Sequence, residues 1–293
     1  MALHKLKEFR APRTVQEAIG FLRGSDDAER LVLAGGTFLH GLEARGLLSD
    51  VEELIDVRGA GLDGIDDDDR GLLVGATITF SRLQSLPVVQ RAPWLAGLSD
   101  ALACPPVQIR NTATIGGCVS ASCPFFDVPT ALLALGAVVT ASGGEAGTRQ
   151  VALPDFLAGL FVNSLEPGEL VTAVAIPKSS GNCASAFIKL EGNANDLAIV
   201  NAAACLSVDD RGVCTDARVA LGGGVAETAV LSPAARRILV GRQLDADTVR
   251  SASDAVTADI SPMSDHRASA EYRSVVAKVI VRRTLERAIA RLA

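Results

Sequence analysis

The chain has 293 residues, of which 48% are hydrophobic and 21% charged, so it can bury an ordinary core and does not have the composition of a disordered chain. Its net charge of −6 and its 4% of aromatic residues argue against a nucleic-acid-binding surface, which needs basic side chains for phosphates and aromatic rings for stacking. The length and composition predict a soluble globular protein with room for two or three small domains.

The start of the chain and its cysteines bear on where the protein works. The first eight residues contain no apolar stretch like that of a signal peptide, and no later apolar run is long enough for an obvious membrane span. Cys118 and Cys123 have the first spacing of a plant-type iron–sulfur motif, but Phe126 stands at its next cysteine position. We therefore predict a cytoplasmic protein that has no membrane span, holds no metal and keeps its six cysteines reduced.

In chain order, the first half predicts short strands that alternate with helices. Thr14 is a good N-cap and Glu17 follows three residues later, so a helix is expected over 14–22. A buried strand is expected over 31–34 and another strand over 54–57, with a brief helix over 38–45 between them. Four acids at 66–69 predict a solvated hairpin tip rather than a metal site. Further elements are predicted as strands over 72–75, 137–141 and 170–176, and as helices over 79–86, 92–104, 128–135 and 154–160.

The last third predicts three strands followed by three helices. The strands are expected over 184–190, 197–208 and 217–221, and the helices begin at Ser232, Ala246 and Tyr272. One face of the last helix, which runs to Leu292, is apolar, and the other carries a set of basic residues: Arg273, Lys278, Arg282, Arg283, Arg287 and Arg291. We interpret this basic face as solvated, with a subunit-docking surface as the alternative.

Two Gly-Gly turns that follow apolar residues are the main functional signal. They are Gly35-Gly36 and Gly116-Gly117. Turns without Cβ atoms let backbone N–H groups converge on an anion and let a ligand approach closely. Neither turn matches the dinucleotide-binding or P-loop glycine pattern. The residues alone therefore predict a phosphate-bearing ligand between two glycine turns, with a purely structural role for each turn as the alternative.

Side chains for nucleophilic or metal-assisted catalysis are not evident. There is no Gly-x-Ser-x-Gly motif, and the three histidines have no zinc-ligand spacing. Asp127 lies at the start of a predicted helix, where a carboxylate normally serves as a cap. The run Gly222-Gly223-Gly224 is interpreted as a tight connection. We therefore predict no catalytic side chain and no metal ligand.

Several ordered segments carry a resemblance that covers essentially the whole chain. They are 31–37 (LVLAGGT), 109–117 (IRNTATIGG), 127–137 (DVPTALLALGA), 176–177 (IP), 187–189 (FIK) and 269–273 (SAEYR). Together they resemble the FAD-binding subunits of molybdenum hydroxylases, which include the medium subunits of carbon monoxide dehydrogenase-like enzymes and the middle domain of xanthine dehydrogenase.

The resemblance implies an α+β fold with a p-cresol methylhydroxylase-like FAD-binding domain. This domain is expected over 1–177, as two α/β subdomains at about 1–57 and 58–177. A C-terminal domain of the molybdenum hydroxylase flavoprotein type, with a small antiparallel sheet and helices, is expected over 178–293. Chain order agrees, because three strands precede the last helices.

By the same resemblance, two segments would surround the FAD pyrophosphate with backbone amides. Asp127 would bind the sugar portion, and Leu170 and Lys189 would lie near the adenine or flavin end. The charge of Lys189 could stabilise a reduced anionic flavin. The implied cofactor-binding residues are Leu33, Ala34, Gly35, Gly36, Thr37, Phe38, Leu39, Thr114, Ile115, Gly116, Gly117, Cys118, Asp127, Leu170 and Lys189.

Some residues depart from the family pattern. Cys118 stands where the family often has Asn or Asp, and Phe38 where a polar residue is common. A basic pair that often follows the lysine is missing from 190–195, and an iron–sulfur insert found in one branch is absent between Cys123 and Asp127. These departures bear on the flavin potential and on the electron acceptor.

The function implied is an oxidoreductase subunit that relays electrons. A large partner subunit would carry a molybdenum–pterin cofactor, and a small partner would carry two [2Fe–2S] clusters and reduce this FAD. The acceptor would be NAD, a quinone or another molecule, and a dimer of heterotrimers is expected. Two alternatives remain, namely a stand-alone flavin oxidoreductase that acts directly on a small substrate and a flavin-free scaffold.

Overall fold

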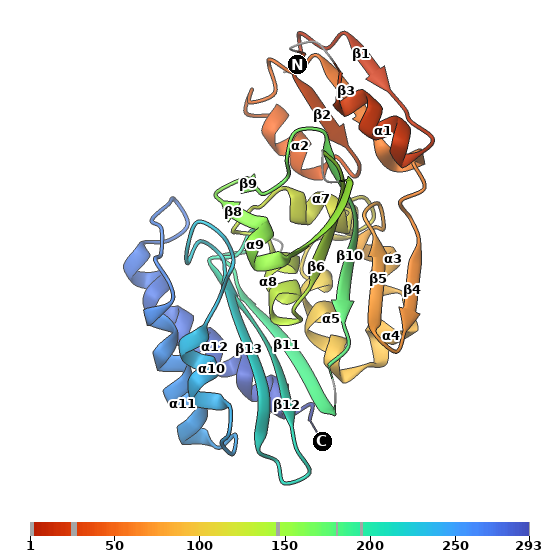
Figure 1. The fold of residues 1–293 in the computed structure, drawn as a ribbon. Helices are drawn as coiled ribbons and strands as arrows, with labels where there is room; N and C mark the ends of the chain where they lie inside the picture. Colours follow the sequence, from red (N-terminus) through yellow and green to blue (C-terminus); the bar gives the residue numbers. More distant parts are fainter. Residues whose placement is uncertain (1–2, 25–27, 145–146, 180, 194–195, 293) are drawn as a thin grey trace.

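The computed structural model describes residues 3–24, 28–144, 147–179, 181–193 and 196–292, and in this part the strands form four sheets. In Figure 1 a small N-terminal sheet lies at the top, a larger sheet lies below it, and the C-terminal sheet and its helices lie at the lower left. The mixture of separate sheets and helices is the α+β class that the resemblance implies.

The N-terminal sheet has the parallel order β1-β3-β2. Thr14 caps the first helix, because its Oγ1 accepts a hydrogen bond from the N–H of Glu17 at 3.1 Å. The predicted helix is thus confirmed. The strand predicted over 31–34 ends one residue early, and it is half-buried rather than buried. The elements are β1 (Glu8–Arg10), α1 (Val15–Leu22), β2 (Arg30–Leu33), α2 (Thr37–Glu43), β3 (Glu53–Asp56) and η1 (Val57–Gly59).

The second sheet has the antiparallel order β4-β5-β10-β6-β7. Its strands are β4 (Ile65–Asp68), β5 (Gly71–Gly75), β6 (Val138–Gly143), β7 (Gly147–Ala152) and β10 (Glu169–Pro177), and β8 (Leu157–Gly159) and β9 (Val162–Asn163) form a separate hairpin. The helices are α3 (Phe80–Gln84), α4 (Pro87–Arg91), η2 (Pro93–Leu95), α5 (Ala96–Ala103), α6 (Val107–Arg110), α7 (Ile115–Ser120), α8 (Asp127–Ala134) and α9 (Leu153–Phe156).

Two predictions in this region need correction. The acidic run at 66–69 does not form only the tip of a hairpin, since most of it lies on β4. The short helix predicted over 154–160 ends at Phe156, and the chain continues directly into β8.

The C-terminal sheet is antiparallel, in the order β11-β12-β13-β14. Its strands are β11 (Asn182–Leu190), β12 (Val200–Val208), β13 (Cys214–Gly222) and β14 (Val230–Leu231), and α10 (Pro233–Leu239), α11 (Ala246–Ala255), η3 (Val256–Ala258) and α12 (Ala270–Ile289) follow. Alternate residues of β12 join two different cores: Ala203 belongs to the core that contains α5 and α8, and Ala204 to the core that contains α11 and α12. Helices therefore cover both faces of this sheet.

The basic residues of α12 do not form one solvated face. Arg273 is fully buried and donates hydrogen bonds to the carbonyls of Ile199, Met263 and Ala268 and to Asp265. The prediction for Arg273 is therefore wrong, because carbonyls from neighbouring segments satisfy its guanidinium inside the protein. In the described part of the chain, no helix combines the length and the apolar character that crossing a bilayer requires.

Candidate functional site

The first glycine turn joins β2 to α2 and leaves backbone donors open. Gly36 has a left-handed backbone, with φ of +69°, and stands at the N-cap of α2 without a capping side chain. Among the described residues, no group accepts a hydrogen bond from the N–H of Thr37, Phe38 or Leu39. Such donors at the start of a helix are free for an external anion.

A groove of about 310 Å³ lies beside this turn. It brings together Leu33, Gly36 and Leu39, three of the predicted site residues, with leucines of β2 and β3. The lining is mainly apolar, so the groove suits an organic ligand surface better than a free inorganic anion.

The sequence predicted a tight turn at the second glycine segment, but Gly116 and Gly117 lie at the start of helix α7. Thr114 caps this helix, and its Oγ1 accepts from the N–H of Gly117 at 3.2 Å. The N–H groups of Ile115 and Gly116 donate to the carbonyls of Ile78 and Ala76, each at 2.9 Å. These amides are already bonded within the protein, so the segment offers close backbone approach rather than free donors.

The two glycine segments lie against each other. A Cβ atom at Gly35 would come 2.1 Å from the carbonyl oxygen of Thr112 and 3.0 Å from Cα of Ala113. A Cβ atom at Gly116 would come 2.5 Å from Cβ of Ala76. The absence of a side chain at Gly35 therefore lets the two predicted segments pack together, and its absence at Gly116 lets the second segment pack against Ala76, just after β5.

Asp127 does not cap α8, since Phe126 is the N-cap residue and no side chain bonds the first-turn amides. Instead, its buried carboxylate faces β11 and β12, with Oδ2 3.2 Å from Nζ of Lys189 and Oδ1 3.0 Å from Nδ2 of Asn201. Lys189 also pairs with Glu191 at 2.9 Å. The structure thus brings Asp127 and Lys189 into direct contact.

Burial dominates the electrostatics of this cluster. It raises the pKa of Asp127 to about 6, although Lys189 and Asn201 oppose that shift. Burial alone would lower the pKa of Lys189, but Asp127 and Glu191 outweigh it and the pKa is raised. The lysine is therefore a fixed cation at neutral pH, and Asp127 titrates close to the physiological range.

An aromatic cluster connects the first glycine turn with the loop before Asp127. The ring of Phe38 lies 5.8 Å from that of Phe126, edge to face, and 5.7 Å from that of Phe161. Phe161 and Ser122 both have left-handed backbones, and the N–H of Phe161 donates to the carbonyl of Ser122 at 3.1 Å. Such backbone conformations in residues other than glycine cost energy and often occur at functional sites.

The remaining predicted residues lie near this region or in the core. Ala34 packs against the core that contains α7 and α8. Cys118 is buried on α7, and burial raises its pKa well above the usual range, so the thiol is not a nucleophile. Leu170 is buried on β10 opposite Ser142, in a different sheet from Lys189.

Sequence reasoning missed Asn201, Glu191, Phe126 and Phe161, and also Thr130, whose Oγ1 donates to Oδ1 of Asn201. Asn201 and Glu191 lie in the C-terminal half, far from Asp127 in the chain, and no motif connects them with it. Phe126 directly precedes Asp127, and that adjacency was the one local signal that could have identified it.

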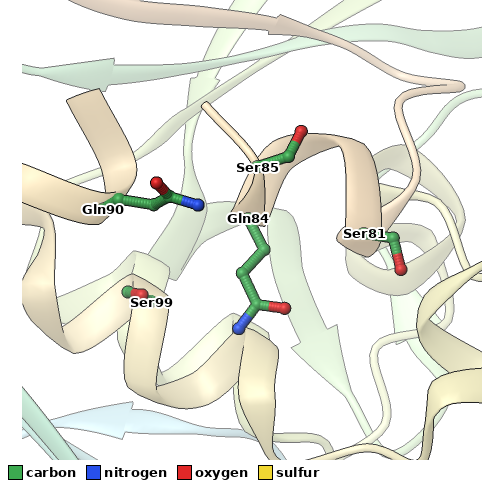
Figure 2. Close-up of a pocket in the computed structure, with 5 residues that line it drawn as sticks. All are labelled: Ser81, Gln84, Ser85, Gln90 and Ser99. Carbon is green, nitrogen blue, oxygen red and sulfur yellow. The ribbon is translucent and has the colours of Figure 1, made fainter. Parts of the chain in front are cut away.

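A larger cavity, of about 470 Å³, lies away from all of these residues. Figure 2 shows its lining, which consists of Ser81, Gln84, Ser85, Gln90 and Ser99 on the helices after β5. None of these residues is ionisable, and none was predicted as a site residue. Its lining therefore offers polar contacts but no acid, base or fixed charge.

Comparisons with known proteins identify relatives over nearly the whole chain. The model of the FAD-binding domain in molybdopterin dehydrogenase matches residues 5–179, and that of the CO dehydrogenase flavoprotein C-terminal domain matches residues 185–288. The chain is 32% identical to 6-hydroxypseudooxynicotine dehydrogenase complex subunit alpha of Paenarthrobacter nicotinovorans, over 95% of this chain and 93% of that one.

Two further matches concern carbon monoxide oxidation. The chain is 32% identical to the carbon monoxide dehydrogenase medium chain of Afipia carboxidovorans, over 97% of each chain. A crystal structure of the Cu,Mo-CO dehydrogenase matches with a TM-score of 0.90 and 32% identity, over 98% of this chain and 99% of that chain.

Proposed function

The chain belongs to the FAD-binding medium subunits of the molybdenum hydroxylase family, and we propose that it relays electrons from [2Fe–2S] clusters of a partner subunit through FAD to an external acceptor. The observation that carries this proposal is the joint match of both family domains, in order and over nearly the whole chain. As a member of this family it is an oxidoreductase flavoprotein subunit.

The pyrophosphate of FAD is assigned to the first glycine turn. Free N–H groups of Thr37, Phe38 and Leu39 support this assignment, because they provide donors without a protein acceptor in the described part of the chain. Gly35 and Gly36 allow the backbone to approach the ligand. The segment from Thr114 to Cys118 is assigned to the opposite side of the ligand, through close contact rather than hydrogen bonding.

Asp127 is assigned to the sugar hydroxyls of FAD. Lys189 and Leu170 are assigned to its flavin or adenine end, where Leu170 would provide an apolar contact with the cofactor. A carboxylate accepts hydrogen bonds from hydroxyls, and a lysine with a raised pKa keeps its charge. FAD held by these residues would supply the redox chemistry, because a flavin can exchange electrons with both one-electron and two-electron partners. This chain's side chains bind, orient and supply charge, and we assign none of them as a catalytic acid or base.

The proposed partners are a large molybdenum–pterin subunit and a small [2Fe–2S] subunit, assembled as a dimer of heterotrimers. Relatives named as a medium chain and as a subunit of a dehydrogenase complex support a multi-subunit assembly. The large subunit would choose the substrate, and the acceptor would be NAD, a quinone or another molecule. The domain limits at 177 and 178 and the cytoplasmic location stay predictions.

Purification of the tagged chain from its native cells tests this assembly. We expect two co-purifying proteins, one with molybdenum–pterin and one with [2Fe–2S] clusters, and FAD that remains with the tagged chain. A chain that purifies alone with FAD and oxidises a small substrate would support the stand-alone oxidoreductase instead. A chain without flavin that also refuses added FAD would support the scaffold.

A further inference from the structure

Asn201 connects the C-terminal sheet with the start of α8. It is fully buried on β12, and its Nδ2 group donates both to Oδ1 of Asp127 at 3.0 Å and to the carbonyl of Phe126 at 3.2 Å. Its Oδ1 accepts from Oγ1 of Thr130, also fully buried, at 2.9 Å. Both ends of the amide are therefore bonded, and the contact with Thr130 turns Nδ2 toward Asp127.

The glycine run at 222–224 makes room for this arrangement. Gly222 pairs with Asn201 across β12 and β13, and a Cβ atom there would lie 2.4 Å from Oγ1 of Thr130 and 2.5 Å from Oδ1 of Asn201. The N–H of Gly223 donates to the carbonyl of Pro124 at 2.7 Å. The run is thus more than a tight connection, because it also holds the loop that leads to Asp127.

The charged and titratable groups that face Asp127 come from three other elements. Lys189 lies on β11 and Glu191 directly follows that strand, Cys104 follows α5, and Cys118 lies on α7. Burial raises the pKa of Cys104 to about 12 and that of Cys118 well above its usual range, so both thiols stay neutral. Burial disfavours the charged form of Asp127, and Lys189 and the neutral donor Asn201 oppose it, while Glu191 adds to it.

We propose that Asn201 is a positioning residue of the flavin site, which holds the carboxylate of Asp127 in place and in its charged form for the hydroxyls of the cofactor. Thr130 fixes the orientation of the Asn201 amide. The C-terminal domain thereby takes part in cofactor binding from a fully buried position. This inference rests on the proposed function, because it needs Asp127 to contact FAD.

The test is the FAD affinity of the flavin-free full chain across pH 5 to 8, measured by flavin fluorescence. For the wild type we expect affinity to fall below pH of about 6, where Asp127 becomes protonated. Asn201→Leu removes the donor at nearly constant volume, so we expect about tenfold weaker binding at pH 7. Its pH midpoint should rise by about one unit, because a hydrogen bond that favours the carboxylate is lost.

Thr130→Val keeps the shape of the side chain and removes only its hydroxyl. We expect the same changes on a smaller scale, and this milder variant carries the test if Asn201→Leu does not fold. Thr284→Val is the matched control, since Thr284 is equally buried but its hydroxyl bonds Ile280 within α12. It should keep the wild-type affinity and pH midpoint.

The outcomes separate the two proposals. If the wild type binds FAD while both Asn201→Leu and Thr130→Val keep its affinity and midpoint, the positioning role is overturned and the electron-relay function stands. A fall in FAD affinity with an unchanged pH midpoint also overturns it. A structural defect alone would weaken binding at every pH without shifting that midpoint. If the wild type binds no FAD, the proposed function fails first and this inference fails with it.

Discussion

Gly35 and Thr112 meet backbone to backbone: a Cβ atom at Gly35 would lie 2.1 Å from the carbonyl oxygen of Thr112. This contact brings the turn after β2 against the segment that leads into α7. It links the two glycine segments and leaves no space for a side chain. The geometry of the proposed FAD site therefore depends on the absence of a side chain at Gly35.

Gly35→Ala should destabilise the flavin-free chain by about 1–3 kcal/mol, because the backbone must move to admit the methyl group. The control is Gly20→Ala, since Gly20 lies in α1 with no atom within 4 Å of the added Cβ. That variant should be neutral or stabilised by up to about 1 kcal/mol. Chemical denaturation of both variants measures the difference, and equal stability would contradict the packing account.

Arg273→Ala should cost about 3–5 kcal/mol of unfolding free energy, because it leaves Asp265 and three carbonyls without their buried donor. Arg283→Ala on the exposed face of the same helix should change stability by about 0.5 kcal/mol or less. Denaturant titration of the two variants checks the contrast. A similarly small effect at Arg273 would show that its hydrogen bonds contribute little.

The carboxyl of Asp127 should make stability fall as pH rises from about 4 to 6. Burial raises its pKa to about 6 in the folded chain from the ordinary value of 3.8, so within this window the folded state holds a proton that the unfolded state has released. Relative to Asp127→Asn, the flavin-free wild type should lose about 2 kcal/mol between pH 4 and 7. If the unfolding free energies of the wild type and of Asp127→Asn change equally with pH, the raised pKa is contradicted.

The carboxyl of Asp265 should change the stability with pH in the direction opposite to that of Asp127. Burial would raise its pKa, but backbone N–H groups and Arg273 outweigh this and lower it to about 2. Its contribution to stability is therefore present above pH 4 and is lost as pH falls toward 2. The loss of stability due to Asp265 occurs below pH 4, whereas that due to Asp127 occurs above pH 4. Measurements across the two pH ranges therefore separate the effects.

Cys183 should react with iodoacetamide at pH 7 before Cys104, although Cys104 is more exposed. The thiol of Cys205, with its sulfur 3.4 Å from that of Cys183, holds the pKa of Cys183 below its usual range, whereas burial raises that of Cys104 to about 12. Peptide mass spectrometry after short labelling gives the order. Cys205→Ala should slow the labelling of Cys183, and faster labelling of Cys104 in the wild type would refute the account.

Local signals in the sequence predicted many elements, and the family resemblance predicted the order of the two domain types. Thr14 is the cap that it appears to be in the sequence, and Ser232 likewise caps α10. Contacts over long chain distances could not be predicted. Asp127 looks like a helix cap until Lys189 and Asn201 are folded against it, some 60 to 75 residues later in the chain.

The second glycine segment was misread for a different reason, because the signal that decides it is local. Gly116-Gly117 reads as a turn from composition, yet Thr114 provides a cap and the pair begins a helix. Helical periodicity placed Arg273 on a basic face, but the carbonyls that accept its hydrogen bonds belong to Ile199, just before β12, and to the loop before α12. Tertiary hydrogen bonds therefore decided the burial of Arg273, whereas a cap three residues away decided the helix at Gly117.

The most direct test of the electron-relay function is the visible flavin band of the FAD-loaded chain under anaerobic conditions. It should be recorded first with candidate substrates alone, namely carbon monoxide, aldehydes and N-heterocycles, and then with a pre-reduced [2Fe–2S] partner subunit freed of excess reductant. We predict that the substrates leave the band unchanged and that the reduced partner bleaches it. Bleaching by a substrate alone, or no response to the reduced partner, would contradict the proposed function.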